Sequence, residues 1–169
     1  MLTQIELKEL LHYDPIRGTF TWLKPPCRTG RVDVGIEAGY LHKKGYIRIG
    51  IWKHQYWAHR LAFLYMTGKW PEGEVDHKNT VKSDNRWDNL RVATRSQNAS
   101  NQRVYKKHAR RFKGVSPCNG RFKAVIGYGG KTYHIGMFKT EEAAARAYDV
   151  EAIKAHGEYA SLNFPLPKE

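Results

Sequence analysis

Four polar residues mark the part of the chain whose side chains could do chemistry. The Asp76-His77 pair is followed by Asn89, within an Asp-Asn-Leu-Arg run, and then by Asn98. Every buried polar group needs a hydrogen-bonding partner, so such a density of Asp, Asn and His is uncommon in a packed core. The pattern therefore indicates a functional site within residues 75–102.

These residue types suit the hydrolysis of a phosphodiester bond. An imidazole that titrates near neutrality can take a proton from an attacking water, and a bound metal can neutralise the charge that develops on the phosphate. An Asn acceptor on one ring nitrogen would fix the tautomer and leave the other nitrogen to take the proton. The alternative is that these residues only cap turns, as Asn and Asp often do, and Asp84 and Asn85 are interpreted in that way.

The flanking sequence predicts a strand, a loop, a strand and a helix. Val75 is suited to end a strand, residues 78–88 are polar and turn-rich, and residues 90–93 alternate roughly in polarity. The run Thr94-Arg95-Ser96-Gln97 fits a capping box that would begin a helix carrying Asn98. This order would bring the Asp-His pair and Asn98 together in space.

The stretch 75–102 resembles the HNH endonucleases, which fold as two strands and a helix around one divalent metal. The resemblance implies that His77 is the general base and that Asn89 orients its ring through the side-chain oxygen. It also implies that Asp76 and Asn98 hold one Mg²⁺ or Mn²⁺ ion. The last position is Asn rather than His, as in a phage subgroup of the family, and oxygen ligands favour these hard ions over zinc.

The charge of the chain favours a polyanionic partner. Its 169 residues carry a formal net charge of +13. No apolar run is long enough to span a bilayer, and the basic residues are scattered rather than gathered on an amphipathic helix. We therefore expect double-stranded DNA, not a membrane, as the partner of a monomer or weak dimer. Candidate DNA contacts are Arg60, Arg86 and Arg91, with an ordinary helix-surface role equally open for Arg60.

Two isolated cysteines, Cys27 and Cys118, favour a reducing compartment and argue against a structural zinc site. Neither belongs to a CxxC pair, which a four-ligand zinc site within one chain usually needs, and disulfides are rare in reducing compartments. Residues 1–6 lack the pattern of a signal peptide. We expect an intracellular protein, and the resemblance implies the cytoplasm of a phage-infected bacterial host.

Residues 1–74 are expected to complete an HNH nuclease domain that extends to residue 102. The sequence predicts a helix over about 4–12, strands over 19–22 and 45–51, and a helix over 59–66 that ends at Gly68. Residues 24–44 are interpreted as a loop. Residues 53–55 are interpreted as a turn. This region is similar to the N-terminal parts of phage HNH proteins, and the second helix is expected to pack beneath the catalytic strands.

A second domain is predicted over residues 112–169, after a basic linker at 103–111 that is a further candidate for contact with phosphate. Its strands are predicted at 112–115, 121–126 and 131–138, with a hairpin turn at Gly129-Gly130. A helix over 141–156 is expected to begin at the N-cap Thr140 and to end at Gly157.

Three runs of this domain, Lys-Gly-Val, His-Ile-Gly-Met-Phe and Glu-Glu-Ala-Ala-Ala-Arg-Ala-Tyr-Asp, resemble the plant ethylene-response-factor (Apetala-type) DNA-binding domain. That domain lays a three-stranded sheet in the major groove. Lys113 matches a DNA-contacting Arg of the family. The family's other contacts fall on different residue types here, so its base code does not transfer; these positions are Ser116, Cys118, Val125 and His134.

Strand periodicity then assigns the faces of this sheet. Phe122, Ala124 and Ile126 should face the helix, with Tyr133 and Ile135 also inward. The opposite face should meet DNA, and its expected residues are Arg121, Lys123, Val125, Thr132 and His134.

The sequence thus predicts an α+β protein, with a ββα-metal nuclease domain followed by a small antiparallel sheet packed on one helix. The predicted activity is metal-dependent DNA cleavage by a phage-type or homing endonuclease. The alternative is a DNA-binding transcriptional regulator with a degenerate nuclease domain. The complete polar set favours the nuclease, because a degenerate domain would be expected to lack one of its members.

Overall fold

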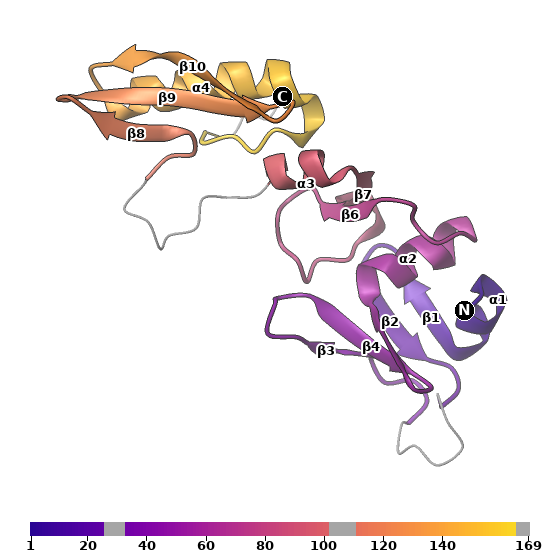
Figure 1. The fold of residues 1–169 in the computed structure, drawn as a ribbon. Coiled ribbons are helices and arrows are strands. Elements are labelled where there is room, and N and C mark those ends of the chain that lie inside the picture. Colours follow the sequence, from indigo (N-terminus) through magenta and orange to yellow (C-terminus); the bar gives the residue numbers. More distant parts are fainter. Residues whose placement is uncertain (26–32, 102–110, 165–169) are drawn as a thin grey trace. The chain divides into compact units, whose positions relative to one another are not determined.

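The computed structural model describes residues 1–25, 33–101 and 111–164, and the chain divides into two compact units, Met1–Thr94 and Arg95–Glu169 (Figure 1). Both units combine helices with small antiparallel sheets, so the predicted α+β class is confirmed. The helix expected to carry Asn98 groups with the second unit by its contacts. The expected basic linker lies almost wholly outside the described residues.

In the described part of the first unit, the strands form three small antiparallel sheets, with strand orders β1-β2, β3-β4-β5 and β6-β7. Its elements in chain order are α1 (Gln4–Leu10), β1 (Leu11–Asp14), β2 (Thr19–Trp22), β3 (Tyr40–Leu41), β4 (Ile47–Ile51), β5 (His54–Trp57), α2 (Ala58–Thr67), β6 (Glu74–His77), the 3-10 helix η1 (Trp87–Asn89) and β7 (Leu90–Ala93).

The first helix begins as predicted but ends earlier. Thr3 and Glu6 form a reciprocal capping box at its start. The expected continuation to residue 12 is wrong, because Leu11 and Tyr13 are buried on either side of the exposed His12. That alternation is the signature of a strand with one buried face, and β1 pairs with β2 over its whole length.

The helix α2 supplies the central apolar surface of the first unit. Leu61 and Leu64 on this helix are buried in one cluster with Ile49 and Ile51 of β4. The predicted end of the helix at Gly68 is confirmed by its left-handed conformation, with φ 77°. The interpretation of residues 53–55 as a turn holds only for Lys53, which lies in the turn between β4 and β5, since His54–Trp57 form the strand β5.

The second unit packs a three-stranded sheet of order β10-β9-β8 on one helix. The predicted hairpin turn at Gly129-Gly130 is confirmed, since Tyr128 pairs with Lys131 across it. Within the described residues, no helix has both the length and the apolar character needed to cross a bilayer. The elements of this unit are α3 (Arg95–Asn101), β8 (Val115–Cys118), β9 (Arg121–Tyr128), β10 (Lys131–Phe138), α4 (Glu141–His156) and η2 (Gly157–Tyr159).

The first strand of this sheet begins at Val115 rather than at the expected Phe112. Gly114 interrupts the extended backbone with φ 73°, and a Cβ there would lie 2.1 Å from the ring of Tyr148. Phe112 instead packs into the core of the unit as a separate buried side chain.

The predicted faces of the sheet agree with its register. Ala124 and Ile126 are buried under α4, whereas Thr132 pairs with Gly127 and His134 with Val125 on the opposite face. A β-bulge follows His134 and changes the pairing of the rest of β10.

Tyr133 departs in part from the prediction that it points inward. It pairs with Ile126 and so lies on the helix side of the sheet, yet 39% of its surface is exposed. The ring lies near the hairpin end of the sheet, where it stacks on Tyr128 with a centroid separation of 4.2 Å.

Candidate active site

The Asp-His pair lies at the end of β6, against the start of β7. Asp76 is opposite Arg91, and His77 is opposite Leu90. Both members of the pair are buried, with 5% and 4% of their surface exposed. The strand pairing therefore holds two adjacent polar side chains at the edge of the apolar core.

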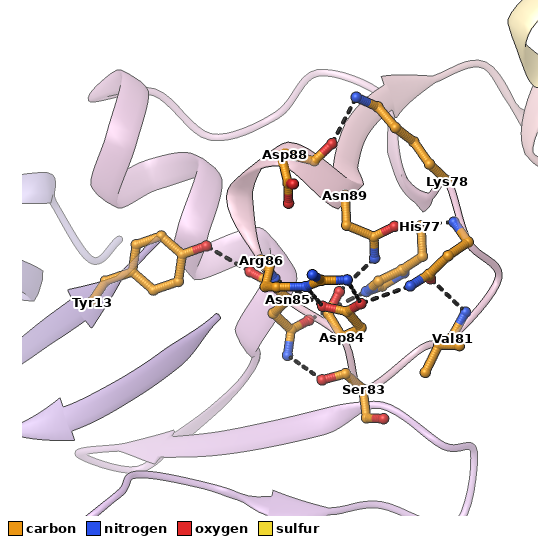
Figure 2. A network of polar contacts seen from close by, with 11 residues as sticks. Tyr13, His77, Lys78, Val81, Ser83, Asp84, Asn85, Arg86, Asp88 and Asn89 are labelled. Carbon is orange, nitrogen blue, oxygen red and sulfur yellow. Dashed lines mark hydrogen bonds and ion pairs between the residues drawn. The ribbon is translucent and has the colours of Figure 1, made fainter. Parts of the chain in front are cut away.

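Asn85 defines the orientation of the His77 ring (Figure 2). Its Oδ1 atom lies 3.2 Å from Nε2 of His77, and its Nδ2 atom donates to the carbonyl of Ser83 at 3.2 Å. The second hydrogen bond makes Oδ1 the atom that faces the ring. Because Oδ1 can only accept, Nε2 carries the ring proton and the lone pair lies on Nδ1.

The surroundings of His77 favour the neutral imidazole. Burial lowers its pKa, and this effect outweighs the hydrogen bond to Asn85 and the negative charge of Asp76, which raise it. The His59 ring approaches edge-on at 5.1 Å between centroids, and the Tyr46 ring lies at 5.8 Å. A neutral ring in a fixed orientation is the form of histidine that can accept a proton.

Asn89 makes different contacts from those expected. Its Oδ1 accepts from the backbone N–H of Asn79 at 3.0 Å, and its Nδ2 donates to the carbonyl of Asp84 at 2.7 Å. Its own carbonyl accepts from Lys78. Asn89 therefore links the two ends of the loop 78–88, and the contact with His77 that was expected of it is made by Asn85.

Asp84, like Asn89, anchors the loop 78–88 through hydrogen bonds. Both of its oxygens accept from the guanidinium of Arg86, at 2.8 and 2.7 Å, and Asn79 donates to it at 2.6 Å. The hydrogen bonds from Arg86, the largest influence, lower the pKa of Asp84 to about 2. Arg86 thus has a protein partner, and its expected contact with DNA stays a prediction.

Asp76 forms a buried ion pair with Arg91. The Nε atom of Arg91 donates to Oδ2 of Asp76 at 2.9 Å, and a terminal nitrogen lies 2.8 Å from the same oxygen. The side chain of Arg91 is only 9% exposed. Its guanidinium is therefore directed at the expected metal ligand, and its expected contact with DNA stays a prediction.

Arg60 is also engaged within the first unit. Its two terminal nitrogens donate to the carbonyls of Gly73 and Pro71, at 3.2 and 3.1 Å. These bonds anchor the chain between α2 and β6. They favour the helix-surface role that the sequence left open over a contact with DNA.

Asn98, the second expected metal ligand, lies on α3 in the second unit. Its pairing with Asp76 around a metal stays a prediction. Among residues 1–25, 33–101 and 111–164, no three His, Cys, Asp or Glu side chains form a metal-binding group. The expected pair contains only one residue of those types.

The candidate DNA contacts of the second unit have two kinds of surroundings. Lys113 is largely buried, its Nζ donates to the carbonyl of Ser100 on α3, and burial lowers its pKa to about 8. That amino group is thus directed into the unit. The remaining candidates lie on the face of the sheet away from α4, and they are Arg121, Lys123, Thr132 and His134.

Comparison with known proteins places this geometry in context. Residues 56–100 match a family model described as HNH endonuclease. An uncharacterized HNH endonuclease of Acanthamoeba polyphaga mimivirus is 36% identical over 128 residues, which are 73% of this chain and 65% of that protein. A solved structure of the HNH homing endonuclease I-HmuI, described as showing DNA binding and cleavage, has a TM-score of 0.42 and 22% identity over 86% of this chain and 84% of its own.

A shorter part of the chain is also similar to plant proteins. An AP2/ERF and B3 domain-containing protein of Oryza sativa subsp. japonica is 50% identical over 56 residues, which are 32% of this chain and 15% of that protein. This chain thus spans just under two thirds of its viral relative and a small part of the plant protein.

The matched segment runs from β5 through α2 and the β6–β7 pair into α3, and it contains the Asp-His pair, Asn89 and Asn98. The similarity to HNH endonucleases therefore covers residues 56–100, the part of this chain that holds the candidate active site.

Proposed function

We propose that this protein is a metal-dependent DNA endonuclease of the phage or homing type, with His77 as the general base. The observation that carries the proposal is the state of the His77 ring within the HNH domain. The ring is buried, its pKa is lowered, and Asn85 fixes it as the tautomer whose lone pair lies on Nδ1. A neutral ring held in one tautomer is the state that a general base requires.

In the proposed reaction, Nδ1 of His77 takes a proton from a water molecule as the water oxygen attacks phosphorus. The bond from phosphorus to the leaving oxygen breaks in line with the attack. The proton on Nε2 remains directed at Oδ1 of Asn85, so the imidazolium that forms keeps a hydrogen-bond acceptor. Proton transfer of this kind typically contributes about 10²–10⁴-fold to a rate.

Asp76 and Asn98 would hold the divalent cation. A carboxylate and an amide oxygen suit Mg²⁺ or Mn²⁺, which bind proteins through few side chains and complete their shell with water and phosphate oxygens. Arg91 donates to Oδ2 of the Asp76 carboxylate and so fixes the orientation of that side chain. Bound there, the cation would supply Lewis acidity and neutralise charge at the leaving oxygen.

The second unit would supply DNA affinity through the face of its sheet away from α4. Arg121 and Lys123 are adjacent positions of one strand face, and Thr132 and His134 are on the neighbouring strand. The resemblance of this unit to the plant ethylene-response-factor DNA-binding domain supports this role. In this division, the HNH domain cuts the strand and the second unit provides much of the binding.

Cleavage of supercoiled plasmid in Mg²⁺ tests the proposal. The wild-type protein should produce nicked or linear DNA, and His77→Ala should cut at least about 10²-fold more slowly while it still binds. His54→Ala is a matched control, because His54 lies on β5 with its side chain exposed. Wild-type cleavage by His77→Ala would refute the assignment of the base.

The same assay distinguishes a nuclease function from that of a DNA-binding regulator. Excess EDTA should stop cleavage, and either Mg²⁺ or Mn²⁺ should restore it. Activity that persists in EDTA, or that zinc alone restores, would contradict an oxygen-ligated site. A wild-type protein that binds DNA but leaves it intact under all these conditions would favour a DNA-binding regulator.

A further inference from the structure

We infer that the β1–β2 hairpin, which lies outside the matched HNH segment, positions the general base through Tyr13 and Asn85. The inference rests on the proposed role of His77. It assigns Tyr13 and Asn85 as positioning residues, since neither contacts the expected reacting atoms. Three sets of contacts carry it, and Figure 2 shows the hydrogen bond of Tyr13 and the contacts of the Asn85 side chain.

The first is a hydrogen bond from the hairpin to the catalytic loop. The hydroxyl of Tyr13 donates to the backbone carbonyl of Asn85 at 2.6 Å, and Tyr13 is 1% exposed. Burial raises the pKa of Tyr13, so the hydroxyl keeps its proton and remains a donor. The rings of Phe20 and Tyr65 pack against Tyr13, with centroids at 4.7 and 5.7 Å, and fix the direction of the hydroxyl.

The second is a close backbone contact at the hairpin turn. Gly18 has φ 73°, and a Cβ on it would lie 2.3 Å from the backbone nitrogen of Arg86 and 2.5 Å from the carbonyl carbon of Asn85. The backbone N–H of Trp87 donates to the carbonyl of Pro15 at 2.9 Å. The hairpin therefore contacts three consecutive residues of the loop.

The third set of contacts connects the backbone of Asn85 to His77 through the Asn85 side chain. Asn85 is 2% exposed, and its side chain has one partner on each end of the amide: Nε2 of His77 and the carbonyl of Ser83. A displacement of the Asn85 backbone would move the acceptor that sets the ring's tautomer. The hairpin thus controls the position of the base from residues distant in sequence.

Asn85→Ala tests the last step directly. We expect the cleavage rate at saturating DNA to fall by about 10–100-fold, the range typical of an outer partner of a catalytic group, with KM changed less than about threefold. Nitrogen-15 NMR of the His77 ring should show the Nε2–H tautomer in the wild type and a mixture in the variant. Asn85→Asp keeps an acceptor at this position and should retain the Nε2–H tautomer.

Tyr13→Phe tests the step through the hairpin. Removal of one oxygen should lower the cleavage rate about tenfold, because small displacements of reacting groups carry large kinetic costs. Tyr65→Phe is the matched control: its ring belongs to the same cluster, and the structure describes no hydrogen bond from its hydroxyl. Gly18→Ala should act like Tyr13→Phe, whereas Gly35→Ala, with φ 87° and no neighbour within 4 Å, should not.

A wild-type cleavage rate and an unchanged His77 tautomer in both Asn85→Ala and Tyr13→Phe would overturn the inference. A change in KM alone would also overturn it, because that points to DNA binding. The NMR experiment needs no substrate. If the wild-type protein proves inactive, the proposed function fails, and the tautomer in the variants still decides whether the hairpin positions His77.

Discussion

Mild acid should destabilise the first unit through His59. This residue lies on α2, 6% exposed, with the rings of Tyr46, Trp57 and His77 around it. Its Nδ1 atom is buried and has no hydrogen-bond partner within the described part of the chain. Burial, with smaller effects from the charges of His77 and Arg60, lowers the pKa of His59 to about 3.

The direction of the stability change follows from the pKa values of His59 in the unfolded chain and in the folded protein. An unfolded His59 would titrate near the ordinary value of 6.5, so between pH 6.5 and 3 the unfolded chain binds a proton that the folded protein does not. Stability is therefore complete above pH 6.5 and falls as the pH falls. At pH 5 the free energy of unfolding is lower by about 2 kcal/mol. This decrease hardly depends on the pKa of His59 in the folded protein as long as that pKa lies well below 5.

Urea unfolding followed by tryptophan fluorescence measures this loss. All the tryptophans lie in the first unit, so the signal reports that unit alone; they are Trp22, Trp52, Trp57, Trp70 and Trp87. His59→Phe keeps an aromatic ring and removes the titration. Between pH 7 and 5, the wild-type midpoint should fall by about 1 M more than that of the variant, for a slope of about 2 kcal/mol per molar urea.

His54→Phe is the control. It replaces an exposed histidine, so this variant should respond to acid as the wild type does. The pKa of His77 is also lowered by burial, so some sensitivity to acid should remain in both variants. Equal losses of stability in the wild type and His59→Phe would refute the reasoning, since they would show that His59 is not held neutral by its surroundings.

Two further predictions concern charged residues. Arg91→Met should destabilise the first unit by about 3–5 kcal/mol, because it leaves the Asp76 carboxylate buried without its partner, and adding Asp76→Asn should recover part of this loss in urea unfolding. Arg121→Ala and Lys123→Ala should each lower the slope of log affinity against log salt by about 0.9 if they contact phosphate, as measured by fluorescence anisotropy, whereas Lys113→Ala should leave it unchanged.

The elements that local chemistry determines could be predicted from the sequence. The capping box at Thr3, the N-cap at Thr140 and the hairpin turn at Gly129-Gly130 each depend on residues a few positions apart. The predictions that proved wrong concern segments whose secondary structure depends on tertiary packing. The helix α1 stops at Leu10 because burial of Leu11 selects a strand, which local propensity does not indicate.

The candidate site could be located from the sequence, but its hydrogen bonds could not. The sequence favours Asn89 as the residue that orients the base and Asn85 as a turn residue. In the structure, Asn85 makes the contact with His77, because the hairpin fixes the backbone of Asn85. That constraint comes from Tyr13, 72 residues away in sequence, so no short motif contains it.

The partners of the arginines also bear on how the protein would hold DNA. Three arginines of the first unit were candidates for phosphate, and each has an internal partner: Arg60 on backbone carbonyls, Arg86 on Asp84, and Arg91 on Asp76. A guanidinium that leaves such a partner for phosphate must break those hydrogen bonds, which lowers the net gain from the new contact. Within the described residues, the surface side chains of Arg121 and Lys123 form no hydrogen bond or ion pair that would have to break. We therefore expect the sheet of the second unit to dominate DNA affinity, and the internal arginines to maintain the geometry of the nuclease site.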